Sequence, residues 1–170
     1  MADTPTSGTV GNINRATASN TFWRNQLYDF SVEGKTASAG TMRSAMNTLY
    51  RRCSRNADVP GLVIFDSNYH DFFESFIQAQ QVFQEAKQAD IGFPYALYKQ
   101  KTKVIYDPNC PANHGYMLNL KYIKVRAHSA VNMKTGKPKY PTNQNATIIP
   151  INWMGNMTLS NGSLQGVMHG

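Results

Sequence analysis

The sequence predicts an α+β fold in a chain of 170 residues, and three patterns support that class. Two segments in the first half repeat apolar residues at the spacing of amphipathic helices, and a short, wholly apolar run lies between them. From residue 98 onward the period changes to two, which is typical of strands with one solvated face. The final segment alternates in the same way up to an Asn-Gly turn. Helices followed by a series of strands are typical of an α+β domain.

The first 21 residues are rich in Thr, Ser, Gly, Asn and Ala. Such a composition buries little apolar surface, so we expect residues 1–21 to form a flexible lead. The next run, "TFWRNQLYDF", concentrates aromatic and apolar side chains. It predicts a strand that anchors the lead to the core.

The first predicted helix begins at Thr41, which is a suitable N-cap residue, and it ends in a basic turn. Its apolar face repeats at the intervals i, i+3, i+4 and i+7. The residues on that face are Met42, Ala45, Met46, Leu49 and Tyr50.

A Pro-Gly break then precedes the apolar run Leu62–Phe65, which predicts a buried strand. Ser67 is the expected cap of a second helix. Four aromatic residues recur along that helix at helical spacing and are expected to face the core: Tyr69, Phe72, Phe73 and Phe76.

Three lysines, Lys99, Lys101 and Lys103, alternate with other residues in the next predicted strand, so they should share one face. That face could contact phosphates, or it could be the solvated side of an edge strand. A turn-rich loop, "DPNCPANHG", separates it from two further predicted strands, "YMLN" and "YIKVRAH".

The polar loop "NMKTGKPKYPTNQN" leads to the last predicted strand pair. Alternation there places five apolar residues on one face, and we expect that face to be buried and to close the core. The residues of this core-closing strand are Ile149, Ile151, Trp153, Met157 and Leu159.

Seventeen Lys and Arg against ten Asp and Glu leave a net charge of +7, which permits phosphate, anionic lipid or acidic protein as a partner. No segment has the pattern of an export signal or the length of a membrane span. Two cysteines form no disulfide framework, so we expect a soluble protein made in a reducing compartment, with no membrane partner.

Residues with catalytic chemistry are few. Cys110 and His114 have a tolerable spacing for two metal ligands, but no second ligand pair accompanies them. Asp66 follows a buried strand, where α/β enzymes place carboxylates, yet a helix start explains it as well. A hydrolase that uses Asp66 or Cys110 is an alternative, but the sequence predicts no catalytic, cofactor or metal site.

Five segments, "GTVGNINRAT", "FWRNQ", "LVIFDSNYHDFFESF", "VIYDPNCPANHGYMLN" and "WMGNMTLSNGSLQGVMHG", resemble in order the C-terminal half of a family of tailed-phage major capsid proteins. The resemblance implies a partial Hong Kong 97-type fold with an axial and a peripheral domain. It implies a mainly axial core at 22–130 and returning peripheral strands at 131–170. Full members of that family have an N-terminal arm, an extended loop and a spine helix before the "GTVG" segment, and we expect this partial chain to lack them.

The same resemblance implies a structural subunit of a phage or prophage head, which self-assembles through pentamers and hexamers into a shell around double-stranded DNA. It would be made in the bacterial cytoplasm and reside in the virion. A basic nucleic-acid-binding module is the alternative. The candidate subunit contacts are the basic residues Arg51, Arg52, Arg55, Lys99, Lys101 and Lys103.

Overall fold

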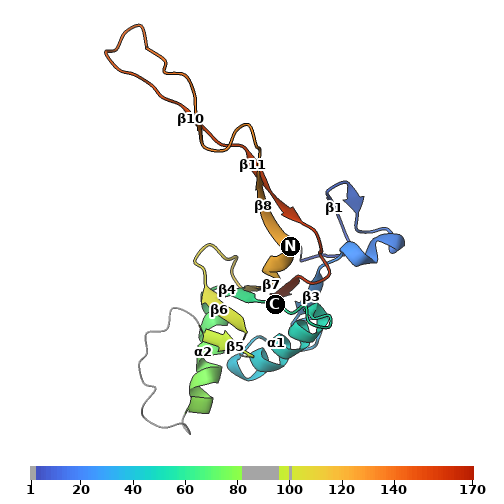
Figure 1. Ribbon diagram of the computed structural model, residues 1–170. Helices are drawn as coiled ribbons and strands as arrows, with labels where there is room; N and C mark the ends of the chain where they lie inside the picture. The colour runs from blue at the N-terminus through green and yellow to red at the C-terminus, as the bar shows by residue number, and fades with distance from the viewer. Residues whose placement is uncertain (1–2, 82–95, 100) are drawn as a thin grey trace. The chain divides into compact units, whose positions relative to one another are not determined.

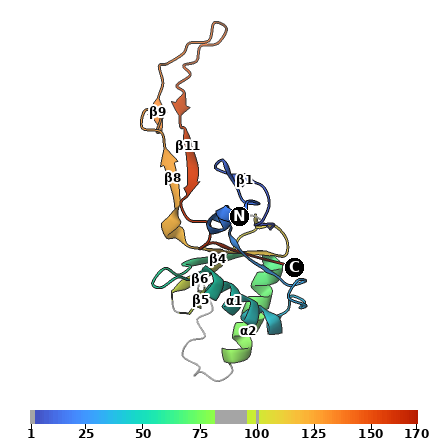
Figure 2. The same cartoon turned by 90° about the vertical axis from the view of Figure 1, so that its right-hand side faces the viewer.

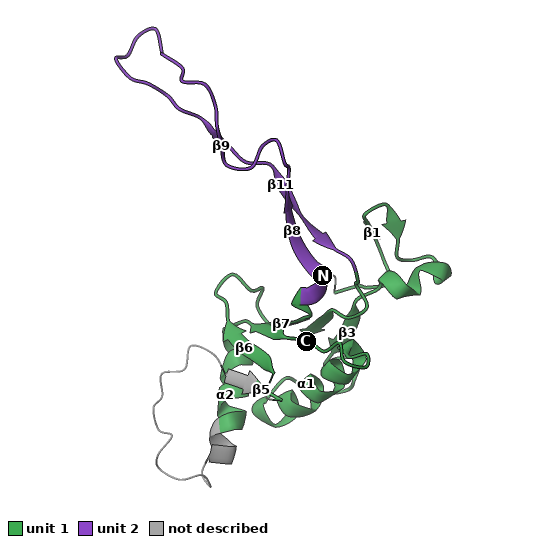
Figure 3. Ribbon diagram, viewed as in Figure 1, with its two compact units in different colours: residues 1–120, 161–170 green, residues 121–160 purple. Residues whose placement is uncertain are grey.

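The computed structural model describes residues 3–81, 96–99 and 101–170 (Figure 1). The chain forms two compact units, coloured separately in Figure 3. Unit 1 comprises residues 1–120 and 161–170, and residues 121–160 form the second unit, which we call the arm. The expected division at residue 130 is therefore displaced. The arm begins ten residues earlier than the predicted second segment, and the last ten residues return to unit 1.

Unit 1 contains a six-stranded mixed sheet with the order β3-β12-β7-β4-β6-β5. β12 runs parallel to β3, and β4 runs parallel to β6, whereas the other neighbours are antiparallel. The strands are β3 (Gln26–Asp29), β4 (Leu62–Phe65), β5 (Ala96–Tyr98), β6 (Thr102–Tyr106), β7 (His114–Leu118) and β12 (Gly166–His169).

Helix α1 (Ala39–Cys53) buries the predicted apolar face. Met42, Ala45, Met46 and Leu49 are inaccessible to solvent, as the spacing predicts. The helix begins earlier than expected, because Ser38 and not Thr41 is its N-cap. The Ser38 hydroxyl accepts a hydrogen bond from the Thr41 N–H, and the Thr41 hydroxyl accepts one from the Ser38 N–H, which makes a capping box.

Helix α2 (Ser67–Gln81) is capped by Asp66, whose Oδ1 accepts from the Tyr69 N–H at 3.1 Å. Ser67 is thus the first helical residue and not the cap. Tyr69 and Phe73 are buried as predicted. Their rings pack edge-on or tilted against Phe65 of β4, so α2 is fixed to the sheet by aromatic contacts.

Both helices pack on one face of the sheet and against each other (Figure 2). The core between the layers draws its buried side chains from α1, α2, β3, β4, β6, β7 and β12. Unit 1 therefore has a two-layer α+β architecture, in agreement with the class that the sequence predicts.

The lead has local structure. β1 (Thr9–Val10) pairs with β2 (Ile13–Asn14), and a 3-10 helix, η1 (Ala18–Trp23), follows. The guanidinium of Arg24 donates to the carbonyl oxygens of Arg15, Ala16 and Thr17 at 2.7 to 3.4 Å, which fixes the end of the hairpin. The expected anchoring strand begins only at Gln26, because residues 18–23 are helical.

The arm is a long, two-stranded antiparallel ribbon, drawn in purple in Figure 3. Next to the short 3-10 helix η2 (Leu120–Tyr122), β8 (Ile123–Ala127) pairs with β11 (Gly155–Leu159). Farther out, β9 (Lys134–Thr135) pairs with β10 (Ile151–Asn152), and Lys139 bridges to Ile148.

The prediction that this strand closes the core is wrong, because most of its apolar face is exposed. The exposed fractions of Ile149, Ile151, Trp153 and Met157 are 53%, 68%, 50% and 67%, and Leu159 is half-buried. The physical reason is that a two-stranded ribbon has no second layer within the arm to cover either face. The strand that closes the core is β12, where Val167 and Met168 are buried between β3 and β7.

This exposure predicts that Trp153→Ala will change stability little. An indole that remains half exposed loses only part of the burial free energy of a core aromatic, so we expect the free energy of unfolding to fall by about 1 kcal/mol or less, against about 3 to 5 for a core site. Thermal unfolding of the variant beside the parent chain measures the difference. A fall in the core range would show that the indole is covered within the folded chain.

Candidate subunit interface

The two faces of the β8/β11 ribbon differ in chemistry. Ile123 lies opposite Leu159, Val125 opposite Met157, and Ala127 opposite Gly155, all on one face. Lys124 opposite Thr158 and Arg126 opposite Asn156 make the other face. The exposed fractions of Val125 and Met157 are 69% and 67%, so the apolar face is open in this chain.

Trp153 extends this apolar face. A β-carbon built on Gly155 would lie 2.4 Å from Cζ2 of the Trp153 indole, so the ring lies directly over the glycine. Only a residue without a side chain allows this contact. The indole is therefore held on the same side of the ribbon as Val125 and Met157.

The arm is also strongly cationic. The forty residues 121–160 contain six Lys and Arg and no Asp or Glu. Lys124, Arg126, Lys134, Lys137 and Lys139 all have exposed side chains. At the distal end Tyr140 is 76% exposed. This cationic surface could be detected from the sequence, because no acidic residue occurs after Asp107.

The arginines predicted as subunit contacts lie at the C-terminal end of α1. Arg52 is occupied within the chain: its guanidinium donates to the Leu27 carbonyl at 2.7 Å and to the Glu33 carboxylate at 2.8 Å. Arg55 donates to carbonyl oxygens of its own turn, and its side chain is exposed, as is that of Arg51. Two of the three arginines thus remain candidates for a contact with another molecule.

The three predicted lysines do not share one strand. β5 ends at Tyr98 and β6 begins at Thr102, so Lys99 and Lys101 lie in the hairpin turn and only Lys103 is on a strand. Lys99 has a positive φ of 50°, and its ammonium lies 4.4 Å from the centre of the Tyr50 ring. The side chains of Lys101 and Lys103 are exposed.

Asp66 and Cys110 have structural roles in unit 1. The buried Asp66 carboxylate caps α2 and accepts from the Asn113 N–H at 2.7 Å, which ties α2 to the loop before β7. Cys110 donates to the His114 carbonyl at 3.5 Å. Burial, together with the charges of Asp66 and Asp107, raises the pKa of the Cys110 thiol to about 11. A thiol that stays protonated is a poor nucleophile.

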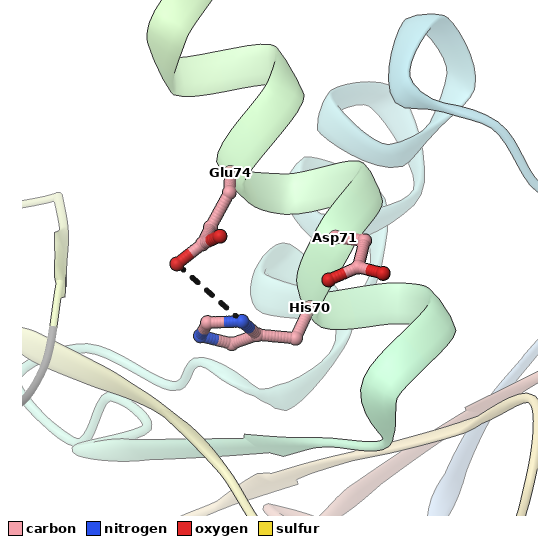
Figure 4. Close-up of side chains that lie close together, drawn as sticks. All are labelled: His70, Asp71 and Glu74. Carbon is pink, nitrogen blue, oxygen red and sulfur yellow. Dashed lines mark ion pairs between the residues drawn. The ribbon is translucent and has the colours of Figure 1, made fainter.

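Cys110 and His114 do not form a ligand pair. Nδ1 of the His114 ring forms a hydrogen bond with the Ala112 carbonyl, and Nε2 lies 3.3 Å from the Asp3 carboxylate. Among the described residues one group brings three metal-ligating side chains together, His70, Asp71 and Glu74 on α2 (Figure 4). His70 and Glu74 form an ion pair at 3.6 Å one helical turn apart, which accounts for that geometry.

No helix in the described part of the chain combines the length and the apolar character that crossing a bilayer requires.

One solved structure with a similar fold is part of a phage capsid. A chain in the capsid asymmetric unit of cyanophage A-1(L) matches with a TM-score of 0.62 and 14% identity, and the match covers 95% of this chain and 55% of that one. The fold is that of a phage capsid protein. The predicted resemblance to a part of a major capsid protein is confirmed at the level of the fold.

Two other solved structures match with lower scores. A virus-like particle from Pyrococcus furiosus has a TM-score of 0.45 at 9% identity, with 85% of this chain and 56% of that chain covered. A chain from phage G major capsid and decoration proteins has 0.44 at 10%, with 98% and 58% covered. This chain thus spans about half the length of its structural neighbours. No protein-family profile and no curated protein sequence matches it.

Proposed function

We propose that this chain is part of a shell-forming subunit of a phage or prophage head, with a Hong Kong 97-type fold, and that it acts by self-assembly and not by turnover. The observation that carries the proposal is the open apolar face of the β8/β11 ribbon on a capsid fold. Val125, Trp153 and Met157 expose apolar surface that gains free energy when another molecule covers it.

In the assembled head this face would pack against another copy or against a part of the subunit that this chain does not contain. Unit 1 would correspond to the axial domain and the arm to the peripheral domain. The protein would be made in the bacterial cytoplasm and reside in the virion, with pentamers and hexamers enclosing double-stranded DNA. Arg51, Arg55, Lys101 and Lys103 remain candidate lateral contacts, because their side chains are exposed.

The double variant Val125→Glu with Met157→Glu tests the apolar face. We expect the parent chain to associate with rising concentration, and the variant to stay monomeric with an unchanged melting temperature, because both positions are exposed in the folded chain. Sedimentation velocity over a range of concentrations, without DNA, measures the association.

The matched control is Asn156→Glu with Thr158→Glu, which adds the same charge to the opposite face of the same ribbon. The control should associate like the parent chain. Equal loss of association in both variants would show that charge and not the apolar face governs assembly. A parent chain that never associates would contradict the assignment of this face to self-assembly.

A further inference from the structure

The positive charge of the chain resides in the arm. The two segments of unit 1 contain eleven Lys and Arg and ten Asp and Glu, which leaves a net charge of +1. The arm contributes the remaining +6 with no carboxylate of its own. Charges within the arm therefore cannot be neutralised by the arm itself, and their side chains extend into solvent.

The strand register separates these cations from the apolar surface. Lys124 and Arg126 occupy the face of the β8/β11 ribbon opposite to Val125 and Met157. Thr158 and Asn156, which lie beside them across the ribbon, are hydrogen-bonding residues. A ribbon built in this way can contact two different partners at the same time, an apolar one and an anionic one.

A second copy of the chain is a poor source of the anionic partner. Its arm is as cationic as the first, and its unit 1 is close to neutral. A nucleic-acid duplex carries about one negative charge per 1.7 Å of its length and supplies a dense, uniform row of acceptors. Lysine, arginine and exposed amide side chains are the groups that contact a phosphate backbone.

We infer that the polar face and distal part of the arm bind the phosphate backbone of duplex DNA without reading its sequence. The residues assigned to this contact are Lys124, Arg126, Lys134, Lys137 and Lys139. Tyr140 follows Lys139 in the sequence and is itself exposed. This inference rests on the proposed function, because a shell subunit is the setting in which one ribbon face meets protein and the other meets packaged DNA.

The triple variant Lys124→Gln, Arg126→Gln and Lys134→Gln tests the contact. Binding of the full chain to a 30-base-pair duplex is measured by fluorescence anisotropy between about 50 and 200 mM salt. If five cations meet phosphates, the affinity of the parent chain should fall about 500-fold over that range, because each contact adds about −0.9 to the log–log slope. With three contacts removed the fall should be about tenfold.

The matched control is Lys35→Gln, Arg43→Gln and Lys99→Gln, which removes the same charge from exposed positions of unit 1 outside the remaining candidate subunit contacts. The control should keep the salt dependence of the parent chain, and a second duplex of unrelated sequence should bind equally well. A control that lowers the slope as much as the arm variant would overturn the inference, as would a parent chain whose affinity for the duplex is insensitive to salt.

The sedimentation measurement without DNA separates this inference from the proposed function. Loss of DNA binding in the arm variant with self-association retained supports the phosphate contact. If the arm variant instead loses self-association and keeps its DNA affinity, the cations meet carboxylates of a second copy and the inference is wrong. If the parent chain binds DNA but never associates, the proposed self-assembly is wrong and the phosphate contact stands.

Discussion

Deletion of residues 166–170 is expected to abolish the cooperative unfolding of unit 1. β12 is an interior strand, hydrogen-bonded to β3 on one side and to β7 on the other. Removing it separates β3 from the sheet, uncovers the core that Met168 fills, and removes Val167, which is buried on the opposite face of the strand. Each of those side chains contributes roughly 1.5 to 3 kcal/mol by burial, and domains are stable by only about 5 to 15 kcal/mol.

The arm offers a deletion of equal length as the control. Residues 141–145 form part of the polar loop between Lys139 and Ile148, and four of the five are exposed. Their removal should leave the melting temperature of unit 1 unchanged. Thermal unfolding and amide exchange of β3 and β7 measure both outcomes. If the chain without β12 still unfolds cooperatively at the parent temperature, the sheet does not depend on its returning strand.

The parts of the fold that the sequence predicts well are those set by local periodicity. α1 and α2 bury the expected faces because side-chain spacing alone determines which residues share a helix face. Their starts are displaced because several good capping residues are close together. Ser38 and Thr41 bond each other, and Asp66 precedes Ser67, so composition cannot choose between them.

Strand patterns are less decisive, because alternation persists through a tight turn. Lys99 and Lys101 continue the period of two, yet Lys99 has a left-handed backbone and the chain reverses there into β6. The arm shows the same limit on a larger scale. The alternation of Met157 and Leu159 correctly places them on one face, but burial depends on whether another layer covers that face.

The candidate site was predicted only in part for the same reason. Basic residues at the end of α1 stand out in the sequence. The Arg52 side chain, however, bonds Leu27 and Glu33 of the same chain, and only the folded structure reveals those contacts. The ribbon interface depends on a pairing between residues about thirty positions apart. Its detectable sequence signal is the alternation of apolar and basic residues at 123–127, in a region without acidic residues.

Substitution of Gln165 is expected to have the second large effect on stability. Its fully buried side chain accepts from the Asn119 N–H at 2.9 Å and donates to the Asn119 carbonyl at 3.1 Å. The amide therefore joins the end of β7 to the segment before β12. Gln165→Leu keeps most of the volume but removes these two bonds and a longer one, which the amide donates to the Asn161 carbonyl at 3.4 Å. Each buried group that loses its partner costs about 1 to 3 kcal/mol. We expect a loss of about 2 to 4 kcal/mol in the free energy of unfolding.

Gln165→Glu separates hydrogen bonding from packing, because it changes one donor atom and keeps the size. An ionised carboxylate can accept from the Asn119 N–H, but it has no hydrogen to give to the Asn119 carbonyl. The introduced carboxyl should therefore have a raised pKa in the folded state, so the folded chain binds more protons than the unfolded one. Stability relative to the parent chain should then rise as the pH falls from neutral toward the ordinary range of a carboxyl group.

Gln165→Leu should show no such pH dependence relative to the parent, and denaturant unfolding at several pH values measures both variants. A Gln165→Glu variant as stable as the parent chain at neutral pH would show that the donated bond to Asn119 does not hold the two segments together.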